Sequence, residues 1–220
     1  MRITLPSGTE AEIDEPNGED DSTMGLVLLP DIFGLRPLFD DMVDRLSSIW
    51  LMTVCAVEPF PGFDLGPDVD ARMAAMSRLD DERHLRDVEE AADATGCERV
   101  GVMGFCMGGM YSFKAARSDR FAKIVSFYGM IRVPEHWKGP GQGEPLAHLA
   151  AGHPDRVLAV IGGRDPYTPP DDVVALDATG VTVVQYPEAE HGFAHDPDRP
   201  AHRADDAADA FLRAHTWLTT

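Results

Sequence analysis

Three features of the sequence predict an α/β fold with a mainly parallel, twisted sheet and helices on both faces. Short runs of apolar and β-branched residues alternate with segments of helical period, which is the pattern of a parallel sheet covered by helices. The runs are almost continuously apolar, as expected of strands buried on both sides. The 220 residues suffice for one substantial core, and no linker-like segment divides them, so we expect a single domain over 1–220.

The order of the elements follows from these runs. The N-terminal segment predicts a hairpin at the sheet edge, with strands at 3–5 and 10–13 and a turn at Ser7-Gly8. Buried strands are expected over Met24–Leu29, Met52–Val57, Arg99–Met103, Lys123–Tyr128, Val157–Ile161 and Val181–Tyr186. Helical segments are expected over Leu38–Trp50, Pro67–Thr95, Met110–Arg117, Pro170–Leu176 and Ala201–Thr216. The segment Arg132–Asp155 contains several Gly and Pro residues and predicts a long loop that contributes to a cap.

Composition excludes several classes of function. The formal net charge is −19, which argues against nucleic acids and anionic membrane surfaces as partners, because both require clustered cations. The three cysteines have no C-x-x-C spacing and predict neither a disulfide framework nor a zinc site. The N-terminus has no apolar signal region, and no stretch approaches transmembrane length. We therefore expect a cytoplasmic protein that binds neither membrane nor nucleic acid.

The segment Gly104-Phe-Cys-Met-Gly-Gly109 directly follows the apolar run Arg99–Met103 and precedes a helical segment. A strand, a G-x-C-x-G turn and a helix form a nucleophile elbow, which presents its middle residue at the end of the sheet. That residue is Cys106, whose thiolate would be favoured by the helix N-terminus. The alternative is a small buried cysteine between strand and helix. The placement of the glycines favours a catalytic nucleophile.

A cysteine nucleophile needs a base, and the base needs an acid that orients it. In α/β hydrolases, which carry such elbows, the chain order is nucleophile, acid, histidine, with the last two on loops after later strands. Asp165 follows the strand Val157–Ile161, and His191 follows the strand Val181–Tyr186. We therefore predict that His191 accepts the proton of Cys106 or pairs with its thiolate. Asp165 would fix the tautomer of the imidazole.

An oxyanion hole is expected from two backbone N–H groups. One is that of Met107, immediately after the nucleophile, and the other that of Ile32, in the turn Leu29-Pro-Asp-Ile-Phe-Gly34 after the first buried strand. Asp31 in the same turn is either a turn-capping residue or part of the site, and the sequence leaves both roles open.

The segment His191-Gly-Phe-Ala-His195 has the spacing of two metal ligands on a helix. Gly192 and the following Asp196-Pro197 disfavour a helix, and a third ligand is missing, so we predict no metal site. The remaining histidines have no comparable surroundings in the sequence: His84, His136, His148, His153, His202 and His215.

Four segments resemble the dienelactone hydrolase family, the cysteine branch of the α/β-hydrolase fold. They are Asp31-Ile-Phe-Gly-Leu35, Gly104-Phe-Cys-Met-Gly-Gly109, Gly162-Gly-Arg-Asp165 and Tyr186-Pro-Glu-Ala-Glu-His-Gly-Phe193. With the hairpin and the last helix, the resemblance covers essentially the whole chain. It implies hydrolysis of a small ester or lactone, of the carboxymethylenebutenolidase type, through a covalent thioester on Cys106. It also implies no cofactor, and a cytoplasmic monomer or small homo-oligomer whose partner is its small-molecule substrate.

Two departures from the family pattern affect the expected site. The family commonly has a glutamate at the position of Asp31, beside the nucleophile, so Asp31 is a candidate modulator of Cys106. The family also holds a substrate carboxylate with arginines, in segments that here read Glu58-Pro-Phe-Pro-Gly-Phe63 and Gly192-Phe-Ala-His195. Without those arginines, an unpaired carboxylate would be costly to bury, and we expect a preference for neutral esters. The expected substrate contacts are Phe60, Phe193 and His195.

Two further interpretations remain open. One is a general carboxylesterase or thioesterase acting on small acyl esters. The other is a non-hydrolytic protein of the same fold, in which Cys106 is a redox-sensing thiol. A redox sensor would need neither Asp165 nor His191 in this chain order, and Cys55 and Cys97 have no spacing that marks them as resolving partners. The hydrolase is therefore the favoured interpretation.

Overall fold

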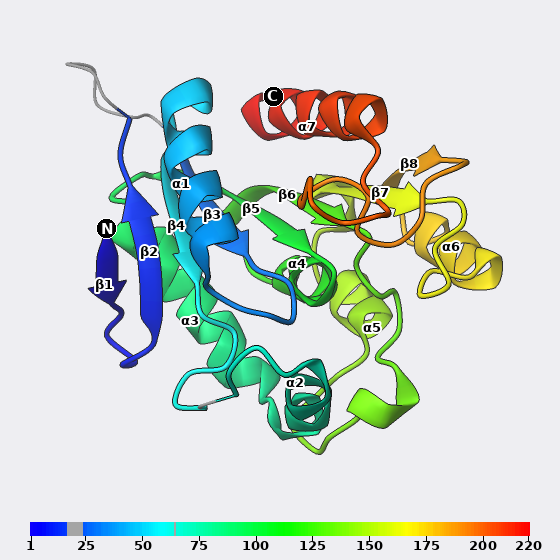
Figure 1. Ribbon diagram of the computed structural model, residues 1–220. Helices are drawn as coiled ribbons and strands as arrows, with labels where there is room; N and C mark the ends of the chain where they lie inside the picture. The colour runs from blue at the N-terminus through cyan, green and yellow to red at the C-terminus, as the bar shows by residue number, and fades with distance from the viewer. Residues whose placement is uncertain (17–23, 64) are drawn as a thin grey trace.

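A computed structural model describes residues 1–16, 24–63 and 65–220, and in these ranges eight strands form one sheet (Figure 1). The sheet has the strand order β1-β2-β4-β3-β5-β6-β7-β8. The hairpin strands β1 and β2 pair antiparallel with each other, and β2 pairs antiparallel with β4; all other pairings are parallel. The strands are β1 (Arg2–Thr4), β2 (Glu10–Asp14), β3 (Met24–Leu29), β4 (Thr53–Val57), β5 (Arg99–Phe105), β6 (Phe121–Phe127), β7 (Val157–Gly162) and β8 (Thr182–Tyr186).

Helices cover both faces of the sheet, which confirms the predicted fold class. Two helices, α1 (Pro37–Trp50) and α7 (Ala204–Thr219), pack on one face around side chains such as Phe39 and Leu218 (Figure 1). The other face is covered by α3 (Asp81–Ala94), α4 (Met107–Ala115), α5 (Pro145–Ala150) and α6 (Pro170–Asp177). The short helix α2 (Val69–Ala75) and three 3₁₀ turns, η1 (Met76–Arg78), η2 (Glu135–Trp137) and η3 (Pro154–Arg156), complete the described elements.

The structure refines two of the predicted segments. The helical segment 67–95 is divided into α2 and α3, because Asp68 and Asp80 each cap a new helix and accept hydrogen bonds from its first turn. The segment Arg132–Asp155 is not simply a loop, since it contains α5 between the 3₁₀ turns η2 and η3. A helix of six residues is too short to show a helical period in the sequence.

No helix in the described ranges combines the length and the apolar character needed to cross a bilayer. Because β3, β5, β7 and β8 run parallel in the sheet, the loops that follow them lie at one edge. Ligand sites of open α/β sheets form at this carboxyl edge. The predicted site residues are therefore expected in the loops that follow these four strands.

Candidate active site

The nucleophile elbow is tighter than the sequence suggested. β5 continues to Phe105 and α4 begins at Met107, so Cys106 alone forms the turn. Cys106 has φ 56° and ψ −115°, a strained backbone conformation for a residue other than glycine. Its N–H is held by the carbonyl of Phe127 at 3.0 Å. Strain at a half-buried cysteine on a helix N-terminus is typical of a residue whose position serves a reaction.

The glycines of the elbow are required by the packing around it. A Cβ atom on Gly104 would lie 2.2 Å from the carbonyl oxygen of Gly108. A Cβ atom on Gly108 would lie 2.0 Å from the carbonyl oxygen of Leu29. Side chains at these positions would force the backbone apart. The close approach of Gly108 to Leu29 also packs the start of α4 against the turn that follows β3.

The structure brings Cys106, His191 and Asp165 together. His191 lies in the loop after β8, and its Nδ1 atom is 2.8 Å from Oδ2 of Asp165, in the loop after β7. His191 lines the same cavity as Cys106, and the interaction with Cys106 is one of the causes that raise the pKa of His191. The second carboxylate oxygen of Asp165 accepts the N–H of Tyr167 at 2.8 Å, which fixes the orientation of the carboxylate. The arrangement has the order and contacts of a nucleophile, base and orienting acid.

The pKa of His191 is strongly raised. Burial by itself would lower this pKa, but the charge of the Cys106 thiolate and the hydrogen bonds with Asp165 and Cys106 raise it to about 10. The imidazole of His191 therefore keeps its proton at neutral pH and is a cation beside Cys106. A thiolate is the form of cysteine that attacks an acyl carbon.

The raised pKa leads to a prediction about the protonation of His191. A free imidazole with a pKa of about 6.5 is mainly neutral at slightly alkaline pH, whereas the ring of His191 should keep both protons there. Cys106→Ala removes the thiolate, so the ring should lose its proton at a lower pH. Nitrogen NMR shifts of the imidazole, followed through a pH titration of both proteins, measure this change. A neutral His191 ring at neutral pH in the wild type would contradict the raised pKa.

Ile32 and Met107 are the two residues whose N–H groups are predicted to bind the oxyanion. Ile32 lines the cavity that contains Cys106, and Met107 is the first residue of α4. Among the described residues, none accepts a hydrogen bond from the N–H of Ile32 or Met107, so both donors are available to a bound substrate. The turn of Ile32 is braced by Glu58, whose carboxylate accepts the N–H of Leu35 at 2.9 Å and of Phe60 at 3.0 Å.

The cavity beside Cys106 has a volume of about 260 Å³. Part of its cover comes from the segment predicted as a cap, because Trp137 of η2 lies over it and its Nε1 atom is 3.1 Å from the sulfur of Met73 in α2. The cavity is lined by Asp31, Ile32, Phe33, Val69, Met73, Cys106, Met130, Trp137, Tyr167, His191 and Arg199.

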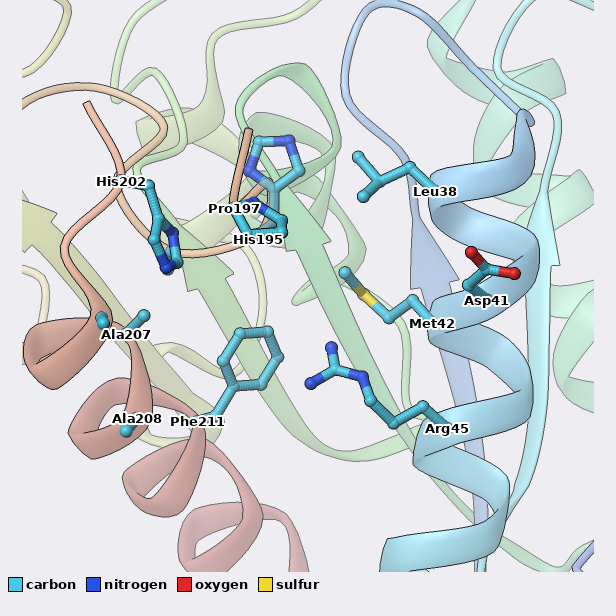
Figure 2. Close-up of a pocket in the computed structure, with 12 residues that line it drawn as sticks. Leu38, Asp41, Met42, Arg45, His195, Pro197, His202, Ala207, Ala208 and Phe211 are labelled. Atoms are coloured by element: carbon cyan, nitrogen blue, oxygen red, sulfur yellow. The ribbon is translucent and has the colours of Figure 1, made fainter. Parts of the chain in front are cut away.

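A larger cavity of about 540 Å³ lies elsewhere, in the groove between α1 and α7 (Figure 2). Leu38, Met42 and Arg45 line it from α1, and Phe211 lines it from α7. Neither Cys106 nor His191 reaches this groove. The smaller cavity is the candidate active site because it contains the predicted nucleophile and its predicted base.

The predicted substrate contacts Phe60, Phe193 and His195 do not line the cavity, and this part of the expected site is corrected. Phe60 is 2% exposed and packs against Phe63. Phe193 is fully buried against Tyr128 and Tyr186. The side chain of His195 has no exposed surface. Their aromatic character reflects core packing, which the sequence could not separate from a role in a pocket.

Asp31 lines the cavity, but its carboxylate does not modulate Cys106 through a direct contact. One oxygen lies 2.6 Å from Arg36 and accepts the N–H of Phe33, and the other lies 2.9 Å from both Arg36 and His195. Among the described residues, the hydrogen bonds of the Asp31 carboxylate come from Phe33, Arg36 and His195, and not from the thiol of Cys106. His195 therefore binds Asp31, whereas His191 binds Asp165, and the two histidines do not share a site.

Arg199 is a charged residue of the cavity that the sequence did not single out. Its guanidinium lies over Gly192, so that a Cβ atom on this glycine would be 2.7 Å from Nη1. Within the described ranges, no residue forms a hydrogen bond or ion pair with the guanidinium. Arg199 follows His191 by eight positions, beyond a turn that contains Pro197. No motif in the sequence indicates that the loop after His191 brings Arg199 back to the cavity.

This fold and site define an α/β hydrolase, in which the loops after parallel strands carry the reacting groups. The model of the dienelactone hydrolase family matches residues 10–220, and the chain belongs to that family. The carboxymethylenebutenolidase of Rhodococcus opacus is 28% identical over 83% of this chain and 75% of its own length. The family and this relative support a hydrolase activity.

Solved structures of the same fold agree with this assignment. A Klebsiella pneumoniae protein provisionally named a dienelactone hydrolase superposes with a TM-score of 0.88 at 22% identity, over 100% of this chain and 98% of its own. A dienelactone hydrolase-like promiscuous phosphotriesterase from metagenomic libraries gives 0.75 at 20% identity, over 100% and 96% of the two chains. At these identities the likeness shows the fold alone.

Proposed function

We propose that the protein hydrolyses a small ester or lactone through a Cys106–His191–Asp165 triad and a covalent thioester. The observation that carries this proposal is the geometry of Cys106, which is held in a strained elbow and lines the same cavity as His191. His191 is in turn 2.8 Å from Asp165. A buried acid, a base and a nucleophile in contact are the parts that acyl transfer requires.

The reaction follows from these contacts. The Cys106 thiolate attacks the ester carbonyl, and the N–H groups of Ile32 and Met107 stabilise the oxyanion. The C–O bond to the leaving group breaks, and the His191 imidazolium gives its proton to the departing alkoxide, leaving a thioester. His191 then takes a proton from water, which attacks the thioester. The thiolate leaves, and the acid product is released.

The unpaired guanidinium of Arg199 supports a substrate that carries a carboxylate. This replaces the preference for neutral esters that the sequence suggested, since that expectation assumed a cavity without an arginine. Arg36 cannot take this role while it binds Asp31. A guanidinium in a partly buried cavity forms strong charge-assisted hydrogen bonds with a carboxylate. The volume of about 260 Å³ restricts the substrate to a small molecule.

Arg199→Met should therefore change substrate preference rather than the chemistry. The wild type should hydrolyse a small lactone bearing a free carboxylate about tenfold or more faster, in kcat/KM, than its methyl ester. The variant should lose about 10–100-fold with the free acid and little with the ester, because a charge-assisted hydrogen bond contributes about 1.5–3 kcal/mol. Steady-state kinetics with the two matched substrates measure both effects.

Arg213→Met is the matched control, because Arg213 carries the same charge on the exposed surface of α7, where it pairs with Asp209. It should leave both substrates unaffected. Equal loss with the acid and the methyl ester in Arg199→Met would contradict the carboxylate site. No hydrolysis of either substrate by the wild type would contradict the proposed reaction class.

We also propose a cytoplasmic location. The support for it is the composition, with three cysteines that lack paired spacing.

A further inference from the structure

His195 is the centre of a buried hydrogen-bond chain behind the active site. Its Nδ1 atom lies 2.5 Å from the hydroxyl of Tyr128, and its Nε2 atom lies 2.9 Å from Oδ2 of Asp31. The imidazole is stacked on Phe39 and Phe105, with ring centroids 6.0 and 5.2 Å away. Figure 2 shows His195 at one end of the groove, next to Leu38 of α1. Full burial of the side chain prevents direct contact with a substrate.

The proton positions in this chain follow from the charge of Asp31. Burial alone would raise the pKa of Asp31, but hydrogen bonds with His195 and Arg36 hold it well below its usual range. An ionised carboxylate can only accept hydrogen bonds, so Nε2 of His195 carries a proton and donates it. Burial lowers the pKa of His195 despite Asp31, which leaves the ring neutral. Its Nδ1 atom therefore accepts the O–H of Tyr128.

Both ends of the chain adjoin reacting groups. Asp31 directly precedes Ile32, the predicted oxyanion donor, and lines the cavity. Tyr128 directly follows β6, whose last residue, Phe127, holds the N–H of Cys106. The Tyr128 ring also lies edge-on to His191, with centroids 5.3 Å apart. The imidazole of His195 thus links the turn of Ile32 to the strand end that supports the nucleophile.

We infer that His195 is a positioning residue that holds the N–H of Ile32 in place for the oxyanion. This inference rests on the proposed function. Without the Nε2–H donor of His195, the main remaining side-chain partner of the Asp31 carboxylate would be Arg36. The side chain of Arg36 is 26% exposed. Oxyanion donors stabilise the transition state only when they are aligned with the developing charge. A small displacement of the turn would lower kcat without changing substrate binding.

The test compares His195→Phe with the wild type. Phenylalanine keeps an aromatic ring between Phe39 and Phe105 but removes both hydrogen bonds. With a small activated ester, kcat should fall about 10–100-fold, as for other residues that orient the groups of an active site through hydrogen bonds. KM should stay within about twofold, because the interaction lost is one made only in the transition state. His195→Gln, which can still donate to Asp31, should recover most of kcat.

A second measurement separates the oxyanion turn from the nucleophile. The rate of Cys106 alkylation by iodoacetamide should be unchanged in His195→Phe, because this reaction needs the thiolate but no oxyanion hole. His84→Phe is the matched control, since His84 is a buried histidine of α3 on the other face of the sheet, and it should leave kcat unchanged. If His195→Phe does not fold, Tyr128→Phe removes only the hydroxyl and should lower kcat in the same way.

Two outcomes would overturn the inference in a wild type that hydrolyses the ester. An unchanged kcat in the folded variants would show that His195 only packs. A parallel fall in alkylation and kcat would show that it acts on Cys106 rather than on the turn of Ile32. A wild type without ester hydrolysis would instead overturn the proposed function, and this role with it.

Discussion

Cys106→Ala is expected to abolish ester hydrolysis, with a loss in kcat of about 10⁴-fold or more, because nucleophile, base and acid act as a unit. In the proposed mechanism, the thiolate attacks the substrate from a position fixed by the elbow and by His191. Alanine keeps the fold of the turn but provides no atom that can form the thioester. Hydrolysis of a p-nitrophenyl ester measures the loss. Intact-protein mass after rapid quenching should show an acyl adduct in the wild type alone.

The other two cysteines provide the controls. Cys55 lies in β4, where burial raises the pKa of its thiol to about 12, and Cys97 is also buried. Stoichiometric iodoacetamide should therefore label Cys106 first, and Cys55→Ala should remain active. Equal labelling of all three cysteines, with activity retained in Cys106→Ala, would contradict the mechanism. That result would favour a redox-sensing protein of this fold.

The fold could be predicted from the sequence because its signals are local. β3 has the bounds that the apolar run predicted, Met24–Leu29, and the hairpin forms as its turn residues indicated. The elbow was identifiable for the same reason, since strand, turn glycines and helix follow one another within a few residues. The six-residue α5 escaped prediction because its signal is shorter than two helical turns.

The site was predictable only where a residue lies within a few positions of the end of a strand. Asp165 and His191 meet because parallel strands end at one edge, which the order of elements implies. Arg199 reaches the cavity only because the loop after His191 folds back, with the N–H of Arg203 bound to the carbonyl of Phe193 at 3.0 Å. Likewise, no pattern distinguishes a histidine in a pocket from His195, whose partners come from distant parts of the chain.

The helix that presents the nucleophile depends on a buried ion pair. Lys114 of α4 has no exposed side-chain surface, and its Nζ atom lies 2.8 and 3.0 Å from the two carboxylate oxygens of Asp81, in the first turn of α3. Lys114→Met should lower the free energy of unfolding by about 3–5 kcal/mol, because it leaves a buried carboxylate without this cation. For a chain of this size, the melting temperature should fall by roughly 10 °C. Urea unfolding and thermal melting measure the two quantities.

Acid sensitivity gives the same prediction an independent test. Burial acts to raise the pKa of Asp81, but His148, Lys114 and the N–H of Gly143 lower it to about 2. A carboxyl group whose pKa is lower in the folded than in the unfolded state stabilises the protein at pH values above its unfolded pKa of about 3.9. This contribution is lost as the pH falls through the pKa of the folded state. Lys114→Met removes part of this effect, so the difference from the wild type should shrink below about pH 4. Lys138→Met, at an exposed lysine, is the matched control and should cost under about 1 kcal/mol. If Asp81→Leu fails to restore stability in the Lys114→Met background, the unpaired carboxylate is not the cause of the loss.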